Sequence, residues 1–215
     1  MKIISLNVGE PRVLLDRGRE VTTGIFKLPV AGPLMLRSTN FDGDRQADLQ
    51  NHGGRNKAVY AYPSEHYEFW RAELSGYELA WGNFGENLTT EGLSEEDAFI
   101  GDQFRIGDAI VKVAQPRIPC YKLGIRLGRD DLPKKFLASG RSGIYFSVVQ
   151  EGFVNVGDSI ELVSRAESRV SIADVNRAFV HSREHSNLLR RIVGSEILPP
   201  GLHQDLVERL ATLEA

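Results

Sequence analysis

The sequence contains one cysteine, Cys120, among its 215 residues. A single cysteine excludes an internal disulfide framework, a CxxC redox pair, an all-cysteine zinc site and an iron–sulfur cluster held by cysteines. Any redox chemistry carried out by this chain must therefore use an external cofactor or a partner protein.

The chain also lacks long apolar runs. None approaches the roughly 18–20 residues that a membrane span needs, and the N-terminal residues lack the apolar core and cleavage site of a signal peptide. We therefore expect a cytoplasmic protein with no membrane segment. Hydrophobic residues make up 41% of the chain and charged residues 26%, which is ordinary for a globular protein with a buried core.

Neither sign of charge predominates overall, because 26 basic and 29 acidic residues leave a net charge of only −3. The segment 112–141 is an exception, with eight basic residues against two acidic ones. Cys120 lies inside it, in the stretch QPRIPCYKL, between Arg117 and Lys122. Positive charge stabilises a thiolate, which is the nucleophilic and metal-binding form of cysteine. These residues leave open a nucleophile, a metal ligand, a sulfur carrier and an inert core cysteine.

The pattern up to about residue 163 is that of short strands separated by Gly, Pro, Asn or Asp. It predicts strands at 2–8, 23–28, 33–37, 57–62, 109–115 and 143–150. Many short strands with repeated turn signals predict a closed β-barrel or a sandwich. One helix is predicted among them, over residues 63–76, where Tyr67, Trp70 and Leu74 share a face.

After residue 163 the hydrophobic period becomes helical. Three short helices are predicted, at 171–180, 186–194 and 199–210. We therefore expect a β domain at 1–163 and a three-helix domain at 164–215. A helix-turn-helix DNA reader is the functional alternative, but from Arg165 onward seven basic residues meet seven acidic ones. A neutral bundle binds phosphates poorly, so we expect no nucleic-acid partner.

Two loops carry groups suited to a ligand. In the first, Gly53 and Gly54 lie between His52 and Lys57. A glycine pair lets the backbone approach a ligand closely, which suits an anion, although the P-loop pattern is absent. In the second loop, residues 82–93 read GNFGENLTTEGL and offer hydrogen-bonding groups at a backbone bend. Taken alone, each loop is equally consistent with a polar turn or a wide hairpin.

Taken together, four segments resemble the MOSC domain, a family named for the C-terminal domain of molybdenum-cofactor sulfurase. They are GDRQADLQNHGGRNKAVYAYPSEHYEFW, GNFGENLTTEGL, IGDQFRIGDAIVKVAQPRIPCYKL and GRSGIYFSVVQEGFVNVGDSIEL. They run in the family's order over roughly residues 20–163, and the C-terminal helices are similar to the appendage of the YiiM branch. The resemblance implies a mainly β, α+β fold: a MOSC-type β-barrel with interspersed helices and a small C-terminal three-helix bundle.

The resemblance also implies a molybdenum cofactor, in which a pterin dithiolene chelates the metal. One thiolate cannot hold a bare metal ion, but it can occupy one position on a metal that arrives chelated. Cys120 is thus the implied metal ligand and catalytic residue. The other implied cofactor-binding residues match the family's motifs or the basic segment, and they are His52, Gly53, Gly54, Lys57, Asn83, Phe84, Gly85, Glu86, Asn87, Arg117, Lys122 and Arg141.

For the YiiM-like and amidoxime-reducing branches, the resemblance implies reduction of N-hydroxylated compounds such as N-hydroxylated purine bases. Because the chain has no iron–sulfur motif, we expect a separate reductase to supply the electrons. The alternative is a non-redox carrier of molybdenum cofactor, or of sulfur on Cys120, and such a carrier would show no substrate turnover. A third interpretation, a pyridoxal-phosphate protein, needs a Schiff-base lysine, and no lysine in the sequence stands out as buried and unpaired.

Overall fold

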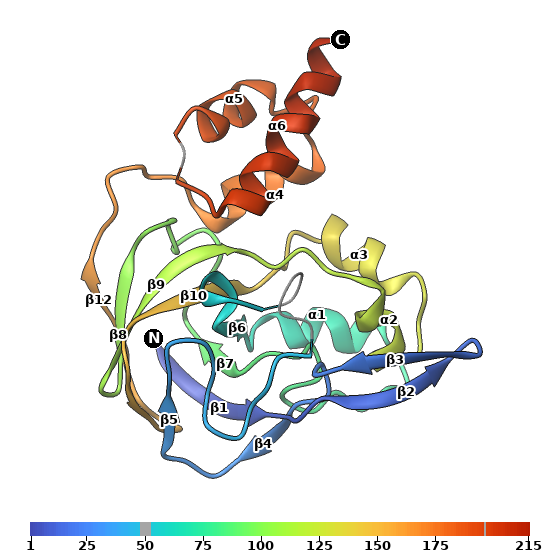
Figure 1. Cartoon of the computed structure of the whole chain (residues 1–215), viewed down its shortest axis with the longest axis vertical. Coiled ribbons are helices and arrows are strands. Elements are labelled where there is room, and N and C mark those ends of the chain that lie inside the picture. The colour runs from blue at the N-terminus through green and yellow to red at the C-terminus, as the bar shows by residue number, and fades with distance from the viewer. Residues whose placement is uncertain (48–52, 196) are drawn as a thin grey trace.

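A computed structural model describes residues 1–47, 53–195 and 197–215. Within these ranges the chain forms a mixed α+β fold with one eight-stranded sheet, two two-stranded sheets, six α-helices and a short 3-10 helix at Arg55–Lys57. Figure 1 shows the strands gathered in one body, with the last three helices stacked against one end of it.

The large sheet provides the scaffold. Its strand order is β12-β8-β9-β10-β6-β7-β1-β4, and neighbours are antiparallel except for the parallel pair β6–β7. The strands are β1 (Lys2–Val8), β4 (Leu28–Val30), β6 (Val59–Pro63), β7 (Leu88–Glu91), β8 (Gln103–Ile106), β9 (Ala109–Pro116), β10 (Ile144–Gln150) and β12 (Ile160–Ser164). Strand β6 is buried along its whole length, as expected for a central strand covered on both faces.

The predicted closed barrel is not present as a continuous ladder, because β12 and β4 remain the edges of the sheet. The sheet nevertheless curls until its two sides meet at one end. There the Ile3 amide donates to the Asp158 carbonyl at 3.0 Å, and the Ile160 amide donates to the Met1 carbonyl at 2.9 Å. These bonds join the start of β1 to the turn before β12, so the sheet is strongly curved but open.

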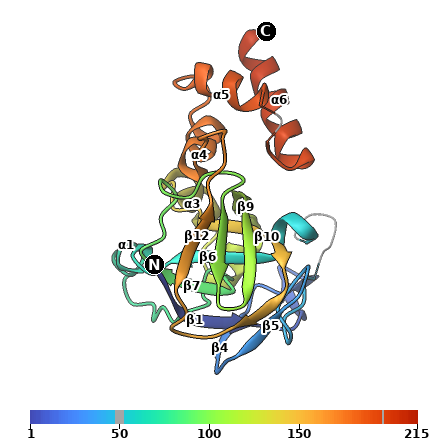
Figure 2. The same cartoon turned by 90° about the vertical axis from the view of Figure 1, so that its left-hand side faces the viewer.

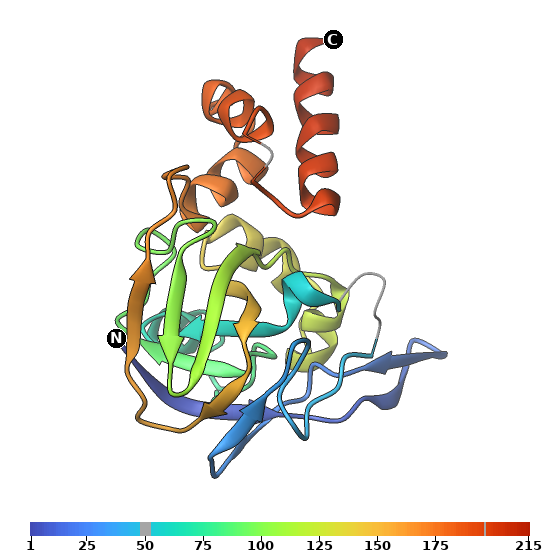
Figure 3. The same cartoon turned by 60° about the vertical axis from the view of Figure 1, so that its left-hand side comes forward.

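Two small sheets complete the β structure. Strands β5 (Leu34–Leu36) and β11 (Gly152–Val154) pair with each other. Strands β2 (Arg12–Asp16) and β3 (Arg19–Thr23) form a hairpin that extends away from the body in Figure 3. Its turn residues, Arg17 and Gly18, both have positive φ, as a two-residue hairpin turn requires.

Most of the predicted strands are present with shifted ends, but the one predicted at 23–28 is wrong. Strand β3 ends at Thr23 and β4 begins at Leu28, and residues 24–27 between them form no strand. Their side chains serve a different purpose, described below: Ile25 and Lys27 line a cavity.

The prediction of a single helix before residue 163 is also wrong. Helix α1 (His66–Glu73) corresponds to it, but α2 (Tyr121–Leu127) and α3 (Leu132–Ala138) follow Cys120. These helices have seven residues each, too short for a clear 3.6-residue period. The C-terminal helices α4 (Ile172–Val180), α5 (Ser186–Val193) and α6 (Pro200–Glu214) match the predicted ones. In the part of the chain that the structure describes, no helix has both the length and the apolar character needed to cross a bilayer.

Helices α1, α2 and α3 enclose an aromatic cluster beside strand β6. The rings of Trp70 and Phe136 stack at 5.5 Å between centroids and 12° between planes. Tyr62 stacks on Phe136 at 5.8 Å and accepts a 2.6 Å hydrogen bond from the Trp70 indole. Phe84 packs against Tyr62 at 4.8 Å. Large rings in close contact form a rigid platform, and this one supports the loops on either side of it.

The C-terminal helices share the main hydrophobic core. Val175, Leu189 and Leu206 belong to the same buried cluster as Ile3 and Phe146 of the sheet. Figure 2 shows α4 nearest the sheet, with α5 and α6 beyond it. The core is therefore continuous across residue 164, and the division into domains at 1–163 and 164–215 stays a prediction.

We predict that Leu206→Ala destabilises the protein by about 2–5 kcal/mol, because truncating a fully buried leucine removes apolar burial and leaves a cavity. Leu206 is 0% exposed. Urea unfolding followed by circular dichroism measures the change. The control is Leu15→Ala on the hairpin, where the side chain is 76% exposed and a change within about 0.5 kcal/mol is expected. Equal effects of the two substitutions would contradict the shared core.

Candidate functional site

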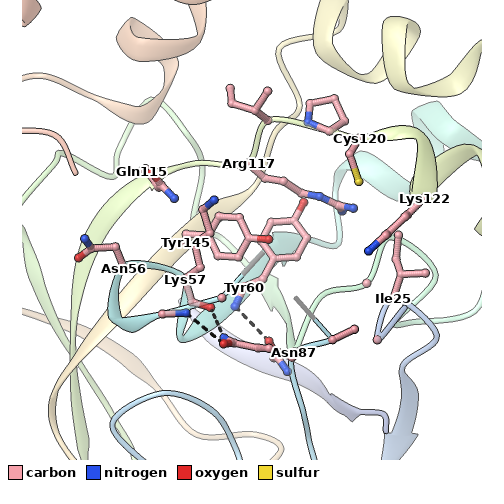
Figure 4. A pocket seen from close by; sticks show the side chains of 18 of the residues that line it. Ile25, Asn56, Lys57, Tyr60, Asn87, Gln115, Arg117, Cys120, Lys122 and Tyr145 are labelled. Atoms are coloured by element: carbon pink, nitrogen blue, oxygen red, sulfur yellow. Dashed lines mark hydrogen bonds between the residues drawn. The ribbon is translucent and has the colours of Figure 1, made fainter. Parts of the chain in front are cut away.

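A cavity of about 650 Å³ lies between the end of β9, the 3-10 turn, the segment after β3 and the start of α6. Figure 4 shows its central side chains. Polar or reactive residues in its lining include Lys27, Asp44, Lys57, Tyr60, Asn87, Gln115, Arg117, Cys120, Lys122 and Tyr145, and further charged residues at its border are Arg45, Arg55 and Asp205. A concave site with a few convergent polar groups is the usual form of a ligand pocket.

Cys120 is held in place by the stretch that ends β9. Pro116 and Pro119 restrict the backbone on its N-terminal side, and Cys120 itself is the residue before α2, in an extended conformation with φ −119° and ψ 173°. The side chain is half-buried. Figure 4 shows its sulfur directed toward the same space as the Arg117 guanidinium and the Lys122 ammonium. The predicted grouping of these three residues is therefore present in the structure.

Arg117 is the most unusual residue of the cavity, because it is a buried cation. Only 7% of it is exposed, and its guanidinium carbon lies 4.9 Å from the Tyr60 ring centre and 5.6 Å from that of Phe136. It donates a hydrogen bond to the Phe84 carbonyl. Among the described residues no carboxylate pairs with it. A buried charge needs compensation, so this arrangement suits an anionic ligand.

The loop 53–57 faces Cys120 from the opposite side. Gly53, Gly54 and Lys57 all line the cavity. Gln46 fixes this loop, because its side-chain amide donates to the Lys57 carbonyl at 2.9 Å and its oxygen accepts from the Gly54 amide at 3.1 Å. His52, which was also predicted to bind the cofactor, lies outside the described residues.

The loop 82–87 is divided between lining and support. Gly85 and Asn87 line the cavity, whereas Asn83, Phe84 and Glu86 do not. Asn83 accepts a hydrogen bond from Arg126, and the Phe84 ring belongs to the aromatic cluster. The side chains of Asn83 and Phe84 therefore support the loop. The Phe84 carbonyl contributes to the cavity by accepting a hydrogen bond from Arg117.

Glu86 organises that loop from inside the protein. It is 0% exposed and accepts from the Gly82 amide at 2.8 Å, the Phe84 amide at 3.1 Å, the Thr89 hydroxyl at 3.0 Å and the Tyr67 hydroxyl. Burial raises the pKa of the Glu86 carboxyl, while these donors act in the opposite direction. The structure gives Glu86 contacts with its own loop and with Tyr67 and does not place it in the cavity lining.

Arg141 is not brought to this cavity. It lines a separate hollow with Phe69, His66 and Asn176, where its guanidinium stacks 3.9 Å from the centre of the Phe69 ring. Arg141 was predicted to bind the cofactor because it lies in the same basic segment as Cys120. Helices α2 and α3 lie between these two residues in the chain and lead Arg141 to a different place. The structure gives this residue no place beside the other predicted ones.

Several cavity residues were missed in the sequence. The rings of Tyr60 and Tyr145 lie 4.9 Å apart between centroids with a tilt of 36°, and the Tyr60 hydroxyl donates to the Ser142 carbonyl at 2.7 Å. Burial raises the pKa of the Tyr60 hydroxyl. Lys27 and Asp44 form a buried ion pair, with side chains 10% and 3% exposed. The motif segments contain Asp44, Tyr60 and Tyr145 but did not single them out, and Lys27 lies outside those segments. Strands β6 and β10 and the segment after β3 meet only in the folded chain.

Residues 48–161 match the MOSC domain family. The chain belongs to this family. A relative that is 44% identical over 196 residues, covering 91% of this chain and 88% of its own length, is the uncharacterized protein YflK of Bacillus subtilis (strain 168). A protein of Gibberella moniliformis named "Reductase" is 35% identical over 80% of this chain, which corresponds to 31% of the fungal protein.

The MOSC chain also matches a solved structure over nearly its full length. The crystal structure of YiiM from Geobacillus stearothermophilus superposes with a TM-score of 0.80 at 36% identity, and it covers 97% of this chain and 98% of that one. The agreement includes the C-terminal helices and identifies a YiiM-like MOSC protein. MOSC domains are associated with binding of the molybdenum cofactor.

The side chains that the structure describes do not form a site for a bare metal ion. In ranges 1–47, 53–195 and 197–215, no three or more His, Cys, Asp or Glu residues are grouped to hold a metal. Cys120 can therefore contribute one ligand to a metal that is already chelated, but the described residues cannot supply a complete coordination shell. The single cysteine and the buried Arg117 fit an anionic, prechelated group.

The start of α6 forms part of the cavity wall. Pro199, Pro200, Gly201 and Leu202 line it together with Asp205. These residues lie outside the matched MOSC segment, which ends at residue 161. Of the three C-terminal helices, α6 therefore contributes directly to the cavity wall, a role that the apolar pattern in the sequence did not indicate.

We predict that Glu86→Gln lowers the free energy of unfolding by about 1–3 kcal/mol, because an amide has one acceptor oxygen and leaves donors of the loop unsatisfied. Urea unfolding near neutral pH measures the change. Glu68→Gln on the exposed side of α1 is the matched control, with a change within about 0.5 kcal/mol. Unchanged stability of the Glu86 variant would mean that the carboxyl is protonated and that the amide replaces it without loss.

Proposed function

We propose that this protein is a molybdenum-cofactor-dependent oxidoreductase that reduces N-hydroxylated compounds, such as N-hydroxylated purine bases, with electrons from a separate reductase protein. One observation carries the proposal. Arg117 is buried at 7% exposure without a carboxylate partner among the described residues, and it lies beside Cys120 in a cavity of about 650 Å³.

The cofactor fits the chemistry of this cavity. It brings a metal that the pterin dithiolene already chelates, so a single thiolate from Cys120 suffices as the protein ligand. Its phosphate is anionic and needs cations, which Arg117, Lys122 and Lys57 supply from two sides of the cavity. Gly53 and Gly54 border the same space and add no side chain there. When bound, the cofactor supplies two-electron redox chemistry at molybdenum.

The residues of this chain bind the substrate and orient it in the cavity. Gln115 and Asn87 offer amide groups to a polar ligand, and the rings of Tyr60 and Tyr145 provide an apolar wall. The Asn87 side chain is itself fixed, because its oxygen accepts from the Tyr60 amide at 3.2 Å and its nitrogen donates to Asp44 at 2.9 Å. Preoriented polar groups bind one substrate geometry in preference to others.

The external electron source follows from the composition of the chain. One cysteine cannot hold an iron–sulfur cluster, so we assign electron delivery to a separate reductase. The fungal relative named "Reductase" is longer than this chain, which covers 31% of it. Its name is compatible with redox chemistry in this part of the family and supports an oxidoreductase over a non-redox carrier.

The test measures molybdenum by mass spectrometry and pterin by fluorescence after oxidation, in protein purified from a host that makes the cofactor. We expect both in the wild type. We expect Cys120→Ala to lose molybdenum, because the metal loses its protein ligand, and Arg117→Met to lose both, because the anion loses its buried cation. Arg141→Met is the matched control and retains both, since Arg141 lines a different hollow.

Turnover then tests the reaction. The wild type, supplied with a chemical reductant, is expected to convert N-hydroxylated adenine to adenine, as followed by chromatography. Equal molybdenum in the wild type and Cys120→Ala would overturn the ligand assignment. Full cofactor content with no reduction of any N-hydroxylated substrate, but with transfer of cofactor to an apo-enzyme, would establish a carrier in place of the reductase.

A further inference from the structure

Lys27 is a buried lysine at the cavity, supplied by the segment between β3 and β4. It is 8% exposed and lines the cavity together with Asp44 and Asn87. Burying a lysine is costly unless its charge is paired. The proposed binding of cofactor and substrate gives Lys27 no role, and the sequence did not single it out.

Asp44 pairs with Lys27, and both of its carboxylate oxygens accept hydrogen bonds. It accepts from the Lys27 ammonium and the Gly9 amide, the latter at 3.0 Å, through one oxygen. Its other oxygen accepts from the Asn87 side chain at 2.9 Å. The carboxylate is therefore fixed from three directions, and it fixes the ammonium in turn.

The ammonium retains donors for a ligand. A lysine ammonium has three N–H donors, and Asp44 is the one acceptor that the described residues give it. Two donors thus remain on a group that is nine-tenths buried and lines the cavity. Donors with this placement can reach a bound substrate without first giving up a bond within the protein.

The surroundings of Lys27 also favour release of a proton from its ammonium group. Burial lowers the pKa of Lys27, and the Asp44 carboxylate opposes this shift. The other charged groups facing it are Glu86, which acts in the same sense as Asp44, and Arg117, which repels the ammonium. A lysine with a lowered pKa at a cavity is a candidate acid or base.

We propose that Lys27 is a catalytic acid, whose ammonium donates a proton to the hydroxyl oxygen of an N-hydroxylated substrate. The proposal rests on the proposed function. In the overall reduction the N–O bond breaks, two electrons from the reductase and two protons are taken up, and the products are the amine and one water. Lys27 supplies one of these protons, solvent supplies the other, and solvent then reprotonates the lysine amine.

The variants separate this role from a structural one. Lys27→Met removes the acid, and Lys27→Met with Asp44→Asn removes the pair together, so that no unpaired buried carboxylate remains if the single variant fails to fold. Lys27→Arg keeps the cation but cannot release a proton in the working range. Lys112→Met, on an exposed position of β9 outside the cavity, is the matched control.

The first readout is cofactor content together with kcat. We expect all variants to keep wild-type molybdenum and pterin, and the Lys27 variants to lose about 100-fold or more in kcat, the usual contribution of a general acid. Wild-type kcat should fall as the pH rises through the Lys27 pKa, and this alkaline limb should be absent from Lys27→Arg. The control should keep both the rate and the limb.

The second readout needs no cofactor. Nuclear magnetic resonance of protein with nitrogen-15 in its lysine side chains follows the Lys27 titration in the apo protein. The Lys27 signal, assigned by its absence from Lys27→Arg, should titrate below the other lysines. In Asp44→Asn it should titrate lower still, because the carboxylate no longer stabilises the ammonium. Titration at or above the pKa of the exposed lysines would overturn the proposal.

The outcomes distinguish the two proposals. Wild-type kcat in Lys27→Met, in a preparation that reduces substrate, overturns the acid role and leaves the reductase standing. Loss of cofactor from Lys27→Met makes Lys27 a cofactor anchor and also overturns the acid role. A wild type that carries full cofactor but reduces no N-hydroxylated substrate overturns the reductase, and the acid role with it.

Discussion

The site depends on keeping one arginine charged inside the protein. Arg117 has a backbone carbonyl, that of Phe84, as its hydrogen-bond acceptor, and this carbonyl is held by a loop that Glu86 organises through four donors. Tyr67 of α1 is one of these donors, and its ring packs on Phe84 at 5.1 Å. Because a buried cation is costly to desolvate, each of these contacts stabilises a charge that is useful only when an anion is bound.

The buried polar groups around the cavity form a connected set. Asn87 links the Tyr60 backbone on β6 to Asp44, and Asp44 links Asn87 to Lys27. Charges and amides in such a network hold one another in fixed orientations, and a half-satisfied network is costly in a dry interior. The protein therefore positions its ligand-binding groups before any ligand arrives, and the binding energy of the ligand is not spent on ordering them.

The sequence predicted the residues that carry motifs and missed those that the fold brings together. Cys120, Arg117 and Lys122 lie within six residues of one another, so a local pattern was enough to group them. Lys27, Tyr60 and Tyr145 come from three distant segments, and only the curvature of the sheet places them on one cavity. Glu86 belongs to a recognised motif. Its position in that motif does not show whether the side chain binds a ligand or accepts hydrogen bonds from its own loop. Helices α2 and α3 were missed because a helix of seven residues is too short for its 3.6-residue hydrophobic period to be recognised.

The direction of α6 matters for attaching the protein to a surface or to a fused partner domain. The helix starts at the cavity wall and ends at Glu214, and Figures 1 and 3 place the C-terminus that follows it far from the sheet. At about 1.5 Å per residue, its 15 residues extend over about 22 Å. A group attached at Ala215 therefore leaves the wall intact and lies about one helix length from the cavity.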